Sequence, residues 1–282
     1  MIPREMIAMM ERRRLVAEVR TATAVQALGV VDALAAAGIA AMEISLTIPG
    51  AQEILTHLAT RRDVLIGAGA VLDTHQANQA ISCGARFIAS PILVPELVPA
   101  CTDAHIACIL GALTPSEIIA AQRAGAEMVK VFPAEALGGP MYIRALLRQL
   151  THLSIQISGG FTAQNMGEYL ALPVRTLALG SLLVPSVLVE RGNWQAITSR
   201  AKAFVEFAAN PHANAARFLA LLGVAPRPQP RAEPPTINLP PGALPGGQVP
   251  APAAGSAAAA TGEFHPWDSR PVDMGDDEDW LR

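Results

Sequence analysis

The sequence contains few cysteines, few aromatic residues and no long apolar run. Its three cysteines are too few and too irregularly spaced for a disulfide framework or a zinc site, which indicates reduced core residues of a cytoplasmic protein. Because no run of eighteen apolar residues occurs, we expect no membrane span. The net charge of −3 gives no general electrostatic case for binding nucleic acid. We expect neither a metal site nor a cofactor.

Lysine is also scarce, because only Lys130 and Lys202 are lysines among 21 basic residues. Arginine stays protonated and cannot act as an amine nucleophile, whereas a desolvated lysine can attack a carbonyl. Lys130 lies in a short apolar segment, where strand alternation places Met128, Lys130 and Phe132 on one face. If helices cover the other face, Lys130 points into a closed interior that disfavours its charge. A lysine that reaches from a strand end to solvent is the alternative.

Composition divides the chain near residue 225. Residues 226–282 hold 12 of the 23 prolines, 4 basic residues and 8 acidic residues. Proline at that density blocks helix and central strand, so we predict a disordered Pro/Ala-rich linker. Its acidic end carries Trp280 and Leu281, which suit a docking peptide for an unknown partner; a solubilising tail without a partner is the alternative.

Residues 1–225 alternate between short apolar segments and longer helical patterns, after a first helix over residues 3–14. We predict strands at residues 15–19, 41–45, 64–68, 86–89, 106–110, 128–131, 153–157 and 175–179. Helices are expected at residues 22–37, 50–60, 74–82, 94–102, 115–123, 141–150, 162–170, 184–190 and 194–222. Eight strand–helix units with short connections predict parallel strands in a (β/α)8 TIM barrel. An open doubly wound sheet is the alternative, but no glycine follows the first strand to form its phosphate fingerprint.

Polar residues stand where the strands of such a barrel would carry reactive groups. Arg20 follows the first strand. In the second strand Glu43 and Ser45 share a face opposite the apolar residues, which sends Glu43 inward. Burial raises the pKa of a carboxyl group, so Glu43 near a reactive lysine is a candidate general acid/base. A structural ion pair between Glu43 and Lys130 is the alternative.

Three strands end in glycine-rich turns. The third strand ends in Gly67-Ala-Gly-Ala70, where the glycines would let a ligand approach the backbone. Ser158-Gly-Gly160 and Leu179-Gly-Ser181 end the last two strands, and we expect each to lead into a helix. Because phosphate sites recur at this place in barrels, the two turns form a predicted phosphate cradle. Glycines that serve only tight turns are the alternative.

Over residues 10–208 the chain resembles the 2-keto-3-deoxy-6-phosphogluconate (KDPG) and 4-hydroxy-2-oxoglutarate aldolase family, class I. The resemblance is carried by Glu43-Ile-Ser-Leu-Thr-Ile-Pro49, Gly67-Ala-Gly-Ala-Val-Leu72, Ser90-Pro91, Lys130-Val-Phe-Pro-Ala-Glu135, Gly138-Gly-Pro140, Ser158-Gly-Gly160 and Leu179-Gly-Ser181. These enzymes are metal-independent barrels and usually homotrimers. The resemblance therefore implies a homotrimer that takes a phosphorylated 2-keto acid.

The resemblance assigns roles by position. It makes Lys130 the Schiff-base lysine and Glu43 the acid/base that works through water, including at the C4 hydroxyl. Substrate-binding positions are Arg20, Thr47, Ala70, Pro91, Phe132 and Ser158. Phosphate-binding positions are Gly159, Gly160, Gly180 and Ser181. Two of these depart from the family pattern, because Ala70 stands where threonine is usual and Ser158 replaces threonine but keeps the hydroxyl.

The expected activity is cleavage of KDPG to pyruvate and glyceraldehyde 3-phosphate. The alternatives within the family are 4-hydroxy-2-oxoglutarate, which has no phosphate, and the galactonate-derived substrate. An alternative of another class is a non-catalytic barrel that binds a phosphorylated ligand and presents its tail to a partner. Ala70 favours that alternative, whereas the presence of both Lys130 and Glu43 argues against it.

Overall fold

The computed structural model describes residues 1–225. The predicted linker and its docking peptide, residues 226–282, lie outside the described residues, and the boundary at residue 225 stays a prediction. Within residues 1–225, no helix is both long and apolar enough to cross a lipid bilayer.

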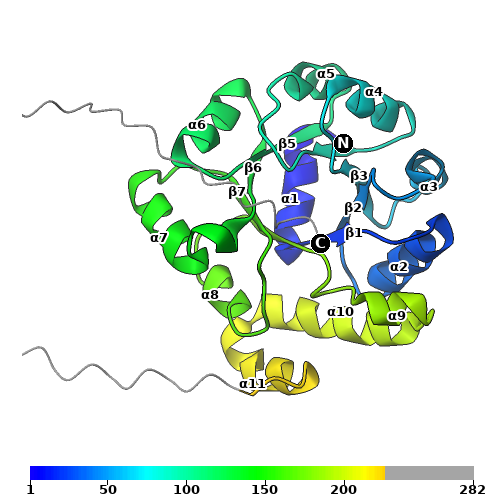
Figure 1. The fold of residues 1–282 in the computed structure, drawn as a ribbon, viewed down its shortest axis with the longest axis vertical. Coiled ribbons are helices and arrows are strands. Elements are labelled where there is room, and N and C mark those ends of the chain that lie inside the picture. Colours follow the sequence, from blue (N-terminus) through cyan, green and yellow to red (C-terminus); the bar gives the residue numbers. More distant parts are fainter. Residues whose placement is uncertain (226–282) are drawn as a thin grey trace, which may run out of the picture. The chain divides into compact units, whose positions relative to one another are not determined.

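Eight parallel strands close into a barrel in sequence order, with β8 pairing β1 (Figure 1). The strands are β1 (Leu15–Val19), β2 (Ala41–Ser45), β3 (Leu65–Gly69), β4 (Phe87–Ala89), β5 (Ala107–Ala112), β6 (Met128–Val131), β7 (Ile155–Ser158) and β8 (Thr176–Leu179). The predicted (β/α)8 barrel is therefore confirmed. Because all strands run the same way, their C-terminal ends meet at one mouth.

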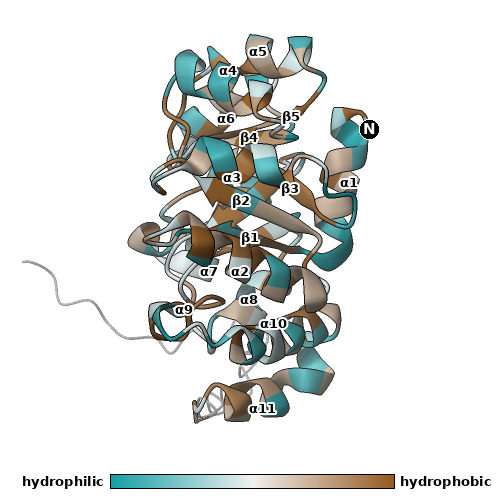
Figure 2. Cartoon of the chain, turned by 90° about the vertical axis from the view of Figure 1, so that its right-hand side faces the viewer, coloured by the Kyte–Doolittle hydropathy of each residue, from teal (hydrophilic) through white to brown (hydrophobic). Residues whose placement is uncertain are grey.

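Helices surround the barrel and bury its apolar strands, which are brown in Figure 2. The helices are α1 (Pro3–Arg13), α2 (Ala24–Ala36), α3 (Ala51–Leu58), α4 (Thr74–Ser82), α5 (Leu97–Asp103), α6 (Pro115–Ala124), α7 (Gly139–Gln149), α8 (Met166–Leu170), α9 (Ser186–Glu190), α10 (Trp194–Ala209) and α11 (Pro211–Leu221). A 3₁₀ turn, η1 (Ala134–Leu137), precedes α7. The predicted N-terminal helix is confirmed as α1.

Helix α6 shows how local sequence sets the boundaries of an element. The Thr114 hydroxyl accepts the Glu117 N–H, and the Glu117 carboxylate accepts the Thr114 N–H, which forms a capping box. Pro115 occupies the first helical position, where its missing N–H costs nothing. The helix ends at Gly125, whose φ of 100° favours a residue without a side chain.

The predicted helix over residues 194–222 is wrong in one respect, because it consists of α10 and α11. Asn210 separates them, and its side-chain oxygen accepts the N–H of Ala213 at the start of α11. Pro211 cannot donate a backbone hydrogen bond, so it begins a helix more easily than it continues one. The Phe218 ring of α11 then stacks on Phe207 of α10, with 4.1 Å between ring centroids.

Other boundaries differ near the mouth. Strands β3, β5 and β7 end one or two residues later than predicted, and α8 and α9 begin later, at Met166 and Ser186. Backbone hydrogen bonds explain the late start of α9: the N–H groups of Leu183 and Val184 both bond the Gly180 carbonyl in a turn. Longer loops at the ends of β7 and β8 leave more backbone facing the mouth.

Candidate active site

Lys130 lies inside the barrel near its mouth. Its strand β6 is buried between β5 and β7, and the residue is 4% exposed. The Nζ atom donates to both carboxylate oxygens of Glu43, at 2.7 and 2.8 Å, and to Glu18 Oε1 at 3.2 Å. Strand alternation thus holds one amine between two carboxylates.

Glu43 projects from the fully buried strand β2. Its carboxylate fits because β3 carries Gly69 beside it: a Cβ at Gly69 would lie 2.6 Å from Glu43 Oε1. Gly67 similarly makes room for the Phe87 ring, since a Cβ there would lie 2.4 Å from it. The structure therefore gives both glycines a packing role, and the close approach of a ligand to this turn stays a prediction.

Glu18 on β1 was missed by the sequence analysis. Its Oε1 accepts hydrogen bonds from Lys130 and from the Ser158 hydroxyl, the latter at 2.8 Å. Its side chain is 30% exposed, compared with 4% for Glu43. The signal was present, because alternation along β1 places Glu18 on the same face as Arg20.

The two carboxylates set the protonation of Lys130. Burial acts to lower the pKa of Lys130, but the negative charges of Glu43 and Glu18 outweigh it, so this pKa is raised. Burial raises the pKa of Glu43, and the positive charge of Lys130 only partly offsets this effect. The interior was expected to disfavour the charge of Lys130, but the two carboxylates favour the protonated amine in the free protein. To act as a nucleophile, the amine would have to pass that proton to a carboxylate.

A small cavity of about 240 Å³ opens in front of Lys130. Both carboxylates line it, together with Ser45 and Gly69. The predicted site residues that also line it are Arg20, Ala70, Pro91, Phe132 and Ser158. Thr47 is the exception, because its hydroxyl hydrogen-bonds Ser45 at 2.8 Å and it lines neither this cavity nor the next.

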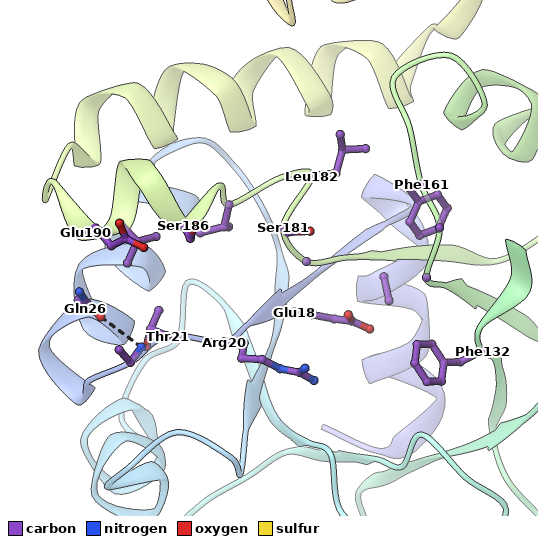
Figure 3. A pocket seen from close by; sticks show the side chains of 17 residues that line it. Glu18, Arg20, Thr21, Gln26, Phe132, Phe161, Ser181, Leu182, Ser186 and Glu190 are labelled. Atoms are coloured by element: carbon purple, nitrogen blue, oxygen red, sulfur yellow. Dashed lines mark hydrogen bonds between the residues drawn. The ribbon is translucent and has the colours of Figure 1, made fainter. Parts of the chain in front are cut away.

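A larger cavity of about 670 Å³ adjoins the small one and shares Glu18, Arg20 and Phe132 with it. Figure 3 shows Glu18 reaching into this cavity between Arg20 and Phe132. Its far wall contains the four predicted phosphate-binding positions, Gly159, Gly160, Gly180 and Ser181.

The wall formed by the loops after β7 and β8 presents backbone donors. Within residues 1–225, the N–H groups of Gly160 and Ser181 donate to no protein acceptor. Each turn is followed by a helix as expected, but α8 and α9 are five residues each and begin beyond the loops, later than predicted. Any anion here would be held by loop N–H groups and the Ser181 hydroxyl.

Residues 1–225 contain no group of three or more His, Cys, Asp or Glu side chains placed to hold a metal ion. The chemistry that the site offers comes from Lys130, Glu43 and Glu18. A buried amine with adjacent carboxylates at the mouth of a barrel is the arrangement of an enzyme that forms an imine with a carbonyl substrate.

Comparison with known proteins identifies the family. The family model described as KDPG and KHG aldolase matches residues 6–200, and the chain belongs to this family. The chain is 36% identical over 192 residues to the 2-dehydro-3-deoxy-phosphogluconate aldolase of Treponema pallidum, covering 67% of this chain and 91% of that protein. It is 38% identical over 167 residues to the Haemophilus influenzae enzyme of the same name. That match covers 59% of this chain and 79% of the Haemophilus enzyme.

A solved structure of the family shows the same fold. The KDPG aldolase of Legionella pneumophila, with pyruvate captured as a covalent carbinolamine intermediate, has a TM-score of 0.66 and 32% identity to this chain. The match covers 70% of this chain and 97% of that one.

Proposed function

We propose that this protein is a class I aldolase that cleaves KDPG to pyruvate and glyceraldehyde 3-phosphate through a Schiff base on Lys130. The observation that carries the proposal is the contact of a buried Lys130 amine with the Glu43 carboxylate at the barrel mouth. The named relatives are carbon–carbon lyases of this type, and the solved structure with a pyruvate carbinolamine supports the same first step.

The reaction begins with proton transfer from Lys130 to Glu43, whose raised pKa favours receiving it. The neutral amine attacks the C2 ketone, and protonated Glu43 returns its proton to the leaving hydroxide, so that water departs and an iminium remains. The iminium withdraws electrons, a carboxylate takes the C4 hydroxyl proton, and the C3–C4 bond breaks. The enamine gains a proton at C3, and hydrolysis frees pyruvate.

The larger cavity supports a substrate with a remote phosphate. The unpaired N–H groups of Gly160 and Ser181 suit an anion, with Gly159 and Gly180 allowing close approach of the backbone. Arg20 lines both cavities and adds a positive charge for the keto-acid carboxylate. Binding energy from the phosphate end positions C2 against Lys130 without being spent on the reacting bond.

A second candidate substrate is 4-hydroxy-2-oxoglutarate, which is the KHG of the family description. It lacks the phosphate, so it would leave the loop N–H groups of the larger cavity without an anion. Steady-state kinetics with phosphorylated and unphosphorylated substrates separate the two. We expect the phosphorylated substrates, gluconate- or galactonate-derived, to give the higher kcat/KM.

We also propose a homotrimer in the cytoplasm. Large apolar side chains are open to solvent in one chain, such as Val25 and Met141, which are 78% and 80% exposed. The three cysteines are free, which suits a reducing compartment. Light scattering on the purified protein checks the assembly: three copies of the 29.5 kDa chain are expected.

Chemical trapping tests the function. The protein is incubated with pyruvate and borohydride, digested, and analysed by mass spectrometry, while pyruvate release from KDPG is followed in a coupled assay. We expect a reduced pyruvate adduct on Lys130 and turnover of KDPG. An adduct on another residue, or the absence of both adduct and turnover, contradicts the proposal.

A further inference from the structure

We propose that Glu18 is a further catalytic residue, the base that takes the C4 hydroxyl proton, while Glu43 serves the nitrogen and C3. The proposal rests on the aldolase function and divides between two carboxylates the work that the family resemblance gives to Glu43 alone. It is carried by position, by hydrogen bonding and by proton balance.

Position separates the two carboxylates. Glu43 lines only the small cavity in front of Lys130, whereas Glu18 lines both cavities. A substrate joined to Lys130 at C2, with its phosphate at the loops after β7 and β8, must pass the junction of the two cavities. C4 lies between these ends of the substrate. Its hydroxyl group would therefore lie near Glu18, which Figure 3 shows between Arg20 and Phe132.

Hydrogen bonding also separates them. Both oxygens of Glu43 accept from Lys130, at 2.7 and 2.8 Å, and the residue is buried. Glu18 uses Oε1 alone for Lys130 and Ser158, and its Oε2 accepts no hydrogen bond within residues 1–225. Glu18 therefore has a free oxygen to offer to a substrate hydroxyl group.

Gly180 keeps that oxygen accessible. A Cβ at Gly180 would lie 3.5 Å from Glu18 Oε2, so a side chain there would extend over the carboxylate. The Ser158 hydroxyl fixes the carboxylate from the other side, through its 2.8 Å bond to Oε1. The glycine after β8 and the serine at the end of β7 thus leave one lone-pair edge of Glu18 open to the larger cavity.

Protons balance when Glu18 serves the C4 hydroxyl group and Glu43 serves C3. As the C3–C4 bond breaks, its electron pair moves into the enamine, the iminium nitrogen is neutralised, C4 becomes the aldehyde, and Glu18 gains the hydroxyl proton. Glu18 is partly exposed and releases that proton to solvent. Glu43, reprotonated through water, delivers one proton to C3, so the cycle has no net proton change.

The experiment compares two reactions of one protein. Cleavage of KDPG needs the C4 proton acceptor, whereas exchange of pyruvate methyl protons for deuterium in D₂O needs only imine formation and proton transfer at C3. We expect Glu18→Gln to lower cleavage by roughly 10²-fold or more while exchange stays within about threefold of the wild type. Glu43→Gln, the matched variant, lowers both. Exchange itself shows that the variant site is folded.

Two results overturn the inference. One is cleavage by Glu18→Gln at the wild-type rate, and the other is loss of cleavage and exchange in equal proportion, which would make Glu18 a group that only positions Lys130. If the glutamine variant does not fold, Glu18→Asp is judged by the same two rates. A wild-type protein that neither cleaves KDPG nor forms the Lys130 adduct overturns the proposed function itself, which is a distinguishable outcome.

Discussion

The two cavities at the barrel mouth are built from different parts of the chain. The small cavity is lined chiefly by side chains that project from strands, with Lys130 and two carboxylates in contact. The larger one is walled by loops after β7 and β8, where glycine backbone and Ser181 face the opening. Strands hold charged side chains more precisely than loops do, which suits bond breaking, whereas loop backbone suits binding.

This difference separates chemistry from binding in a testable way. Changes at the strand residues should reduce the rate of bond cleavage or imine formation. Changes at the loops should weaken the binding of phosphorylated substrate and leave the reaction of Lys130 with pyruvate intact.

Lys130→Arg should have the largest effect. Arginine keeps a positive charge between Glu43 and Glu18, but it cannot act as an amine nucleophile. We expect KDPG cleavage to fall by more than roughly 10⁴-fold, with no borohydride adduct, in a chain that remains folded by circular dichroism. Lys202→Arg on α10 is the matched control and should behave as the wild type. Residual trapping in the Lys130 variant would move the nucleophile elsewhere.

Glu43→Gln should slow cleavage by roughly 10²–10⁴-fold, because the proton on the amine loses its acceptor. The pKa of Lys130 is raised by Glu43 and Glu18, so removal of one charge lowers it. A lower pKa makes the neutral amine available at lower pH, and the pH profile of pyruvate trapping should shift in that direction. Turnover near the wild-type rate would return Glu43 to a structural ion pair.

Gly160→Ala should damage binding more than chemistry. Gly160 has a φ of +76°, and a Cβ there would lie 2.0 Å from the Glu135 Cβ, so the loop must move. Loss of its N–H contact to a phosphate should raise KM for KDPG by roughly 10- to 100-fold.

Trapping of pyruvate on Lys130 should change little in this variant. Gly167→Ala on α8 is the control, because its Cβ would meet Phe207 at an ordinary 3.4 Å. If Gly160→Ala reduces pyruvate trapping as much as it raises KM for KDPG, the two cavities do not divide chemistry from phosphate binding.

The same contrast explains how far the sequence could be used for prediction. Alternation along strands is local, so the barrel and the shared interior of Lys130 and Glu43 could be predicted from the chain alone. The role of Gly69 could not, because β2 and β3 pair Gly69 with Ser45 and the Glu43 side chain reaches Gly69 from two residues earlier on β2. The starts of α8 and α9 depend on turns such as that at Gly180, which composition does not specify.

Glu18 teaches a different lesson. Alternation along β1 places Glu18 on the same face as Arg20, just as alternation along β2 places Glu43 inward. What the sequence could not give is its contact with Lys130, since β1 and β6 are far apart in the chain and are joined only through barrel closure. Burial lowers the pKa of Lys130, and the negative charges of Glu43 and, to a smaller extent, Glu18 raise it above its usual value.

Ala70→Thr should have a smaller effect, confined to the small cavity. Ala70 lines the small cavity with a φ of +58°, a conformation that a β-branched residue adopts poorly. A threonine hydroxyl would add a hydrogen bond to the keto acid and lower KM about 2- to 10-fold, while strain lowers stability by about 1 kcal/mol. Ala70→Gly removes the backbone strain at this φ and adds no hydroxyl group. We therefore expect a higher Tm and an unchanged KM. A lower KM in both variants would show that the tighter substrate binding comes from the changed backbone and not from the threonine hydroxyl group.

Deletion of residues 226–282 should have the smallest effect on turnover. The residues that line the two cavities run from Glu18 to Glu190, and the last helix of the described part, α11, packs on α10 through Phe218. Residues 1–225 therefore supply Lys130, both carboxylates and the loop wall after β7 and β8. We expect kcat and KM for KDPG within about twofold of the full chain, measured side by side with the Tm of each. A large loss of kcat would place part of the active site in the deleted segment and contradict the predicted boundary at residue 225.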